Sequence, residues 1–294
     1  DNCFTRRAVG VALDGTGFGD DGAIWGGEVF VGSLGSGFER AAHLEYMPLL
    51  GGEAAVREPW RMALALAWKY APEDLGFIAG LMEVSDARLG LLQRQLEAGL
   101  NCPRTSSCGR LFDAVAAMAM GRLTVSYEAQ AAMEFEAAAS REKEAGHYGP
   151  GRLIDRHAPD AAADAKSGRK AESGIVYRFS LDKTTVPWII SPGRVIKRVI
   201  SNIAGGESAE NIARSFHLGL AEAIVRTSLG LAARHGLDTV ALSGGVFQNR
   251  LLLNFVREGL IREGLVALIH RQVPPNDGGV SLGQAAIASH LHND

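Results

Sequence analysis

The chain has 294 residues, of which 47% are hydrophobic and 21% charged, with a formal net charge of −3 at pH 7. This length suits one large domain or two small ones, and the charge argues against a broad nucleic-acid-binding surface. No apolar run approaches the ~18 residues of a membrane-spanning helix, no signal peptide is evident, and three scattered cysteines exclude a disulfide framework. We therefore expect a cytoplasmic protein with neither a membrane nor a nucleic acid as partner.

The first fifty residues have the pattern of three strands joined by short turns. The run AVGVALD (8–14) is almost continuously apolar, which is typical of a strand buried on both faces. Residues 23–33 and 38–49 are the next two expected strands. Short Gly- and Asp-rich segments between them predict antiparallel hairpins.

Residues 53–145 change to a helical period, with apolar side chains three and four residues apart. The expected helices cover 58–71, 86–100, 109–121 and 127–146. Residues 146–174 have little periodicity and are rich in Gly, Ala, Asp, Lys and Arg, which predicts a flexible surface loop.

The rest of the chain alternates strands with helices. A strand at 175–181 precedes a helix at 191–206 and a long helix at 208–236, for which Ser208 is the expected cap and Gly236 the stop. A strand–helix–strand–helix series then covers 239–245, 247–264 and 265–271, and its last helix follows the loop PPNDGG and ends at about His290. Strands joined by helices in this way pair in parallel.

This order of elements resembles the ribonuclease-H-like lobe of the actin-like ATPase superfamily. We predict an α/β fold with a mixed five-stranded sheet and a large helical insertion. Residues 1–52 and 175–294 would form the lobe, and 53–145 would be inserted after the third strand.

Three glycine turns at strand ends indicate one cleft for a phosphorylated ligand. Asp14 precedes Gly-Thr-Gly, the strand at 239–245 ends in Gly-Gly, and Asp277 precedes Gly-Gly. Glycine allows close approach of a phosphate, and a helix N-terminus favours an anion. On this basis the candidate phosphate or nucleotide contacts are Ser243, Gly244, Gly245 and Asn249.

The two carboxylates at these turns are the candidate metal ligands. Asp14 ends a buried strand, where a carboxylate is costly unless it is paired or metal-bound. Helix capping is the alternative role for Asp277. His217, in the long helix, is expected to pack or hydrogen-bond there rather than bind a metal.

Five motifs, in order, resemble the C-terminal part of the hydrogenase-maturation carbamoyltransferase family HypF. They are ALDGTGFGDDGAIWGGEVF (12–30), TSSCGRLFDAVAAM (105–118), ARSFHLGLA (213–221), LSGGVFQNRLLL (242–253) and NDGGVSLGQAAIA (276–288). That part of the family is related to the tRNA threonylcarbamoyladenosine transferase and to antibiotic O-carbamoyltransferases. The resemblance spans nearly the whole chain apart from 146–174.

The resemblance implies ATP and carbamoyl adenylate as ligands, with a divalent metal that is iron or zinc. Asp14 and Asp277 match the family's metal-ligating aspartates. Gly109 and Asp113 match the segment that contacts the nucleoside. The positions around the nucleotide are matched by Gly244, Gly245, Asn249 and Asn276.

The resemblance also implies a reaction, in which the carbamoyl group passes from carbamoyl adenylate to the C-terminal cysteine of a HypE-type acceptor protein. The product is the precursor of the cyanide ligands of nickel–iron hydrogenase. The acceptor then supplies the nucleophile, and no catalytic residue is assigned here. The family's two histidine ligands belong to a segment upstream of Asp14, so we expect the chain alone to be inactive and to need the upstream domains.

Alternatives from other classes stay open. An O-carbamoyltransferase or a tRNA-modifying relative would differ in its acceptor, and the net charge of −3 argues mildly against tRNA. A sugar kinase or ATPase of the same superfamily would release ADP. A non-catalytic docking module could keep a vestigial cleft, although the presence of Asp14, Asn276 and Asp277 argues against decay.

Overall fold

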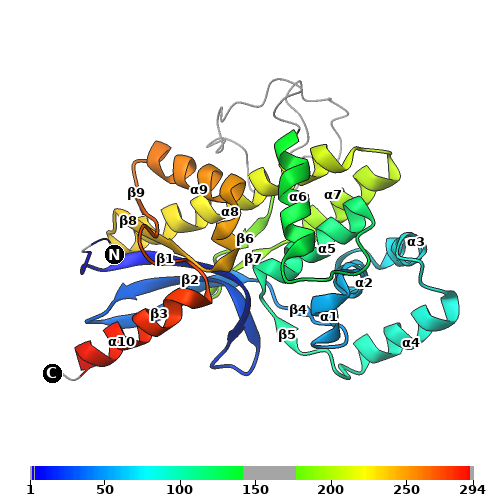
Figure 1. The fold of residues 1–294 in the computed structure, drawn as a ribbon, viewed down its shortest axis with the longest axis horizontal. Helices are drawn as coiled ribbons and strands as arrows, with labels where there is room; N and C mark the ends of the chain where they lie inside the picture. Colours follow the sequence, from blue (N-terminus) through cyan, green and yellow to red (C-terminus); the bar gives the residue numbers. More distant parts are fainter. Residues whose placement is uncertain (1, 3, 142–176, 292–294) are drawn as a thin grey trace.

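A single mixed sheet organises the chain. The computed structural model describes residues 2, 4–141 and 177–291 (Figure 1). Strand β1 (Ala8–Phe18) pairs antiparallel with β2 (Ile24–Ser33) and parallel with β8 (Thr239–Ser243). With β3 (Gly37–Leu44) and β9 (Val266–Leu268) they form the block β3-β2-β1-β8-β9. This block confirms the predicted ribonuclease-H-like order.

The described sheet has nine strands, so the predicted number of five was too small. Strand β7 (Trp188–Ser191) pairs parallel with β3, and β6 (Ser180–Asp182) pairs antiparallel with β7. Strands β4 (Met47–Pro48) and β5 (Arg104–Thr105) attach beside β2. Strand β6 overlaps only the end of the strand expected at 175–181, β4 lies within the one expected at 38–49, and β5 and β7 were not expected. All four are two to four residues long, which is too short for a recognisable alternation of apolar residues.

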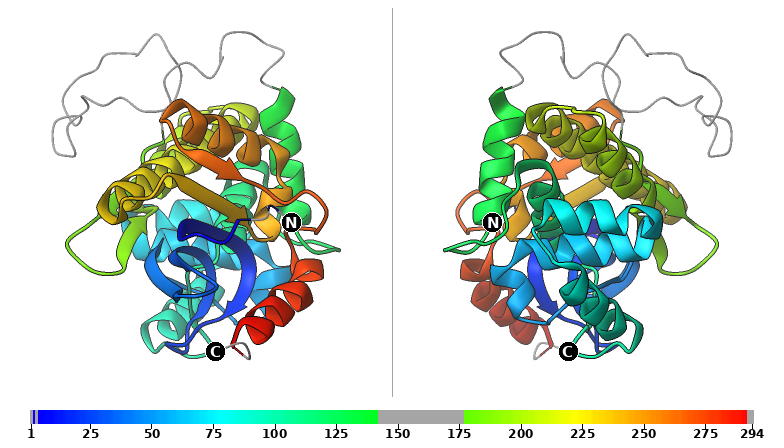
Figure 2. Two further views of the ribbon diagram at one scale, coloured as in Figure 1. Left: turned by 90° about the vertical axis from the view of Figure 1, so that its left-hand side faces the viewer. Right: turned by 90° about the vertical axis from the view of Figure 1, so that its right-hand side faces the viewer.

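The described helices include eight that the sequence predicted and two short ones, at residues 54–57 and 75–81, that it did not. They are α1 (Ala54–Arg57), α2 (Pro59–Tyr70), α3 (Leu75–Leu81), α4 (Asp86–Glu97), α5 (Cys108–Met120), α6 (Gln130–Arg141), α7 (Gly193–Ala204), α8 (Ala209–His235), α9 (Arg250–Arg262) and α10 (Val280–Leu291), with the 3-10 turns η1 (Pro72–Asp74), η3 (Gly245–Gln248) and η4 (Asp277–Gly279). Helix α10 lies apart from the others, in red in Figures 1 and 2. Within the described ranges, no helix combines the length and apolar character needed to cross a bilayer.

Helix α8 begins and ends at the residues predicted from the sequence. The Ser208 hydroxyl accepts a hydrogen bond from the Asn211 N–H at 3.2 Å, which satisfies a donor of the first turn. Gly236 ends the helix with φ of 65°, a left-handed conformation that glycine adopts without steric cost.

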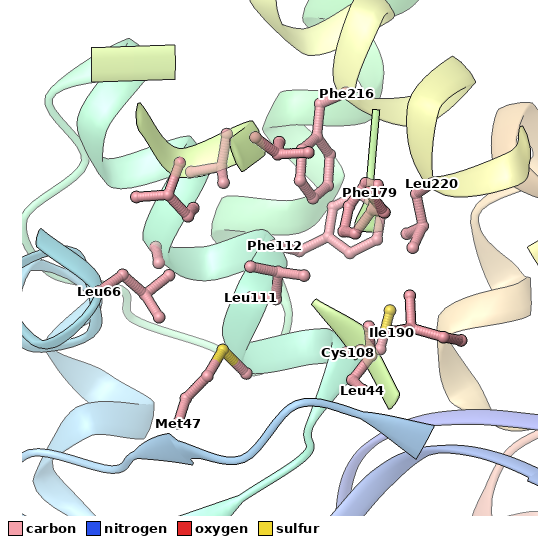
Figure 3. Packing of buried hydrophobic residues seen from close by; sticks show 14 of the residues in the cluster. Leu44, Met47, Leu66, Cys108, Leu111, Phe112, Phe179, Ile190, Phe216 and Leu220 are labelled. Atoms are coloured by element: carbon pink, nitrogen blue, oxygen red, sulfur yellow. The ribbon is translucent and has the colours of Figure 1, made fainter. Parts of the chain in front are cut away.

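One hydrophobic core joins the sheet to the helices. Alternate residues of β1, beginning with Val9, are buried in it. Phe112 of α5 meets Phe216 of α8 edge to face, with ring centroids 5.1 Å apart (Figure 3). The ring centroid of Phe135 in α6 lies 5.9 Å from that of Phe216. Aromatic pairs of this kind add about 1 kcal/mol beyond area burial, so α5, α6 and α8 are held together firmly.

The predicted insertion therefore shares a core with the predicted lobe, because α5 and α6 belong to the insertion and α8 belongs to the lobe. The boundaries 1–52, 53–145 and 175–294 remain predictions. The loop predicted at 146–174 lies outside the described residues.

Candidate functional site

One pocket, with a volume of about 400 Å³, brings together the turns singled out in the sequence. The predicted site residues that line it are Asp14, Gly109, Asp113, Gly245, Asn249, Asn276 and Asp277. Ser243 and Gly244 are not among its lining residues. These segments are far apart in the sequence and meet because the ends of β1 and β8 are neighbours in the sheet.

Asp14 links two of the glycine turns. One carboxylate oxygen accepts the Gly15 N–H at 2.7 Å, and the other accepts the Gly245 N–H at 3.2 Å. These two hydrogen bonds hold the half-buried carboxylate at the pocket wall and replace part of the hydration that it loses there.

Asp277 stands at the same pocket with an exposed side chain. Helix capping was the alternative role for Asp277, but the turn η4, which leads into α10, is capped by Asn276, whose side-chain oxygen accepts the Gly278 N–H at 3.1 Å. The Asp277 carboxylate is not the cap of this turn.

The two carboxylates fit part of a metal coordination sphere. Oxygen donors of this kind suit hard or intermediate divalent ions. Among the residues that the structure describes, no group of three or more His, Cys, Asp or Glu side chains is placed to hold an ion. Asp14 and Asp277 would need further donors to complete a site.

The Gly-Gly turn after β8 differs from the expectation of an open helix N-terminus. Gly244 has φ of 102°, and a Cβ there would overlap the Leu13 carbonyl oxygen, so glycine is required. Its N–H donates to the Pro275 carbonyl at 2.9 Å. The chain then enters η3, and α9 starts only at Arg250.

The first N–H groups of α9 are satisfied by side chains. Leu251 N–H donates to Glu136 Oε1 at 3.1 Å, and Leu252 N–H donates to Asn249 Oδ1 at 2.9 Å. This end of α9 therefore holds fewer free donors for an anion than predicted. Ser243 also has a partner, since its hydroxyl lies 2.9 Å from His270 Nε2.

The start of α5 forms another wall of the pocket. The Ser107 hydroxyl accepts the Arg110 N–H at 3.0 Å and donates to the Gly15 carbonyl at 2.6 Å, so it ties α5 to the turn after Asp14. A Cβ on Gly109 would lie 2.9 Å from Gly15 Cα. The close approach of helix and turn explains the glycine in this motif.

A buried ion pair is part of this wall. Arg110 Nη1 and Asp113 Oδ2 are 2.7 Å apart, and the side chains are 6% and 4% exposed. Burial raises the pKa of Asp113 to about 6, while the Arg110 guanidinium opposes the rise. The sequence motif identified Asp113 but not Arg110, which also lines the pocket.

Helix α6 and the two residues before it supply a pocket wall that was not predicted. Its pocket-lining residues are Glu128, Ala129, Ala132, Met133 and Glu136. The helical period at 127–146 was visible, but nothing in it distinguished this face from an ordinary packed one. With Phe112, these residues combine apolar surface with carboxylates. This combination suits a ligand that has both a flat apolar ring and a separate group with hydroxyls.

Comparisons with known proteins agree on one family. The family model described as "Carbamoyltransferase, Kae1-like Domain, second subdomain" matches residues 10–284. The carbamoyltransferase HypF2 of Cupriavidus necator is 35% identical over 290 residues, which cover 96% of this chain and 33% of that protein. A HypF homolog from the same organism is 37% identical and is covered to 65%, with 96% of this chain aligned.

Two solved structures have the same fold. Full-length HypF in the phosphate- and nucleotide-bound form has a TM-score of 0.80 and 33% identity, with 98% of this chain and 40% of that chain covered. HypF of T. kodakarensis has a TM-score of 0.75 and 27% identity, with 98% and 34% covered. The chain thus spans between a third and two thirds of the length of these relatives.

Proposed function

Because the chain belongs to the HypF family of carbamoyltransferases, we propose that its pocket is the nucleotide half of a carbamoyl-transfer site. The observation that carries the proposal is the meeting of Asp14, Asp113, Asn249 and Asp277, from four separate motifs, around one pocket. The ligand would be ATP and the carbamoyl adenylate derived from it.

The nucleoside would lie between α5 and α6. Phe112, Ala132 and Met133 offer apolar surface to the base, and Asp113 and Glu136 offer carboxylate oxygens to ribose hydroxyls. A carboxylate that accepts from a hydroxyl gives a strong, charge-assisted hydrogen bond. The nucleotide-bound form of a related structure supports this use of the fold.

The phosphate end would face Asp14 and Asp277. These carboxylates would hold the iron or zinc ion together with two histidines from the upstream part of a HypF chain. When bound, such an ion neutralises phosphate charge and polarises the carbamoyl carbonyl. The residues of this chain hold the adenylate in place, with the Gly109 and Gly245 turns allowing close approach of the backbone.

The acceptor would be the C-terminal cysteine of a HypE-type protein in the cytoplasm. Its thiolate would form a bond to the carbamoyl carbon while the carbon–oxygen bond to AMP breaks and the electron pair leaves on the phosphate oxygen. Among the described residues that line the pocket there is no Ser, Thr or Cys. A nucleophile supplied by a partner protein is consistent with that lining.

Calorimetry would test the proposal on this chain and on the chain joined to the upstream segment of a HypF relative. We expect both to bind ATP, Asp113→Asn to weaken binding at least tenfold, and only the joined form to bind zinc tightly. Asp277→Asn should abolish zinc uptake, whereas Asp182→Asn, at the exposed last residue of β6, should change neither ATP binding nor zinc uptake. Failure of the joined form to bind ATP would refute the proposal, and steady ADP release would favour an ATPase.

A further inference from the structure

His217 is buried in the first half of α8, next to the pocket but not among its lining residues. Its side chain is fully inaccessible and lies among aromatic rings, with centroids at 5.2 Å from Phe112 and 5.7 Å from Phe135. Its Nδ1 lies 2.7 Å from the Ala213 carbonyl oxygen, and its Nε2 lies 2.9 Å from Asn249 Nδ2. Both ring nitrogens are therefore used.

These contacts permit one arrangement of hydrogens. A carbonyl oxygen only accepts, so Nδ1 must carry the ring hydrogen, and Nε2 of the neutral ring is then an acceptor. An amide nitrogen only donates, so Asn249 Nδ2 donates to Nε2. The Asn249 oxygen in turn accepts the Leu252 N–H at 2.9 Å.

The relay from Leu252 through Asn249 and His217 to Ala213 therefore runs in a single direction. A flipped Asn249 amide would set its nitrogen against the Leu252 N–H and its oxygen against the lone pair of Nε2. Each mismatch would leave a polar group without a hydrogen-bond partner, which destabilises the flipped orientation. The amide orientation of Asn249 is consequently fixed from both sides.

Asn249 also lines the pocket, and its amide nitrogen has a second hydrogen that the relay does not use. We propose that His217 is a positioning residue that holds this second N–H of Asn249 as a fixed donor toward an acceptor atom of the bound nucleotide. The inference rests on the proposed nucleotide site and adds a specificity rule: the ligand must present an oxygen or nitrogen acceptor at Asn249.

The surroundings of His217 keep it neutral, as the relay requires. Burial lowers its pKa to about 4, the Ala213 carbonyl opposes this, and the nearby Arg214 charge adds to it. The groups that face the ring from α5 and α6 are the uncharged rings of Phe112 and Phe135, and from the residue that caps α9 the uncharged amide of Asn249. At neutral pH the acceptor at Nε2 is therefore preserved.

Three substitutions separate positioning from packing. The amide of glutamine can place an acceptor near the position of Nε2, asparagine can keep only the bond to Ala213, and phenylalanine keeps only the ring. We expect His217→Gln to bind ATP within about threefold of the wild type, and His217→Asn and His217→Phe to lose at least tenfold. In an Asn249→Ser background, which keeps a cap for α9, His217→Asn should cost no further affinity.

Melting temperature is measured on every variant, since a merely structural His217 would lower it in all three and leave ATP affinity unchanged. That result would overturn the proposal. Nitrogen-15 NMR of the His217 ring tests the hydrogen-bond relay without any ligand. We expect Nδ1 to carry a proton and Nε2 to carry none from pH 5 to 8. A proton on Nε2 would also overturn it. A wild-type chain with the expected ring that fails to bind ATP would instead refute the nucleotide site and, with it, the donor role.

Discussion

Ala129 has a backbone conformation that alanine rarely adopts. Its φ is +59°, directly before α6, and it lines the pocket. A Cβ in the left-handed region costs about 1–2 kcal/mol, and glycine avoids this cost. We expect Ala129→Gly to stabilise the chain by about 1 kcal/mol in urea unfolding. Ala132→Gly is the control, because Ala132 lines the same pocket within α6 and its replacement should destabilise by about 1 kcal/mol. Destabilisation by both would contradict the strain at Ala129.

Asp113 gives a prediction about pH. Because its folded-state pKa of about 6 lies above the ordinary 3.8, the folded chain binds more protons than the unfolded chain between these values. Stability from this group is therefore present below pH 3.8 and is lost as pH rises through 6, on the order of 3 kcal/mol in total.

Asp113→Asn isolates this effect, because the variant lacks the titrating group. The unfolding free energy of the wild type minus that of the variant should fall as pH rises from 4 to 7, and the His217 titration cancels in this difference. A rise of the same difference with pH would show that the Arg110 charge outweighs burial and that the carboxyl is ionised throughout.

Single residues of the site were predictable where chemistry restricts the choice. Gly109, Asp113 and Asn249 belong to motifs, and each meets the pocket. Arg110 and Glu136 were missed because a charged residue on a helix is more often solvated than buried at a ligand site. Only tertiary packing, which sets α6 across from α9, gives Glu136 its contact with the Leu251 N–H.

At the scale of elements, α5 is positioned by its cap. Ser107 caps α5 and also bonds to the Gly15 carbonyl, whereas Ser208 caps α8 without a pocket contact. Loss of either hydroxyl should cost about 1 kcal/mol of stability. We expect Ser107→Ala to weaken ATP binding about tenfold as well, because the turn after Asp14 is released, and Ser208→Ala to leave binding unchanged. Equal affinities in calorimetry would show that the cap has no influence on the pocket.

Element prediction succeeded where the periodic signal was long and failed where the signal was local. The 27 residues of α8, with a serine cap and a glycine stop, were placed within a residue at each end. The strands β5 and β7 are too short for a periodic signal, and the strand expected at 175–181 overlaps β6 only at residues 180 and 181. The η3 turn was read as the first turn of α9, since a sequence cannot show that Gly245 bonds to Asp14 before the helix begins.

At the scale of the whole molecule, burial is distributed unevenly. Helices α5 and α8 lie in the shared core, whereas α10 lies apart from the other helices (Figures 1 and 2). None of the side chains from Val280 to His290 in α10 is buried. The large apolar side chains of α10 are about half exposed, at 51% for Val280, 55% for Leu282 and 45% for Ile287. Helices in proteins owe most of their stability to a packed face, and a 12-residue helix without one is marginal in water.

Hydrogen exchange should therefore separate α10 from the core. We expect backbone amides of α10 to exchange at least a hundredfold faster than those of α8, because α10 opens locally and α8 opens only with global unfolding. Gly283→Ala should slow exchange in α10 by up to about fivefold, since alanine favours a helix by about 1 kcal/mol and nothing lies within 4 Å of the added Cβ. Gly219→Ala in α8 is the opposite case, because its Cβ would overlap the Tyr177 carbonyl, so the chain should be destabilised globally. Protection of α10 within tenfold of α8 would mean that α10 opens with the core as one cooperative unit, and Gly283→Ala would then change the exchange of both helices together.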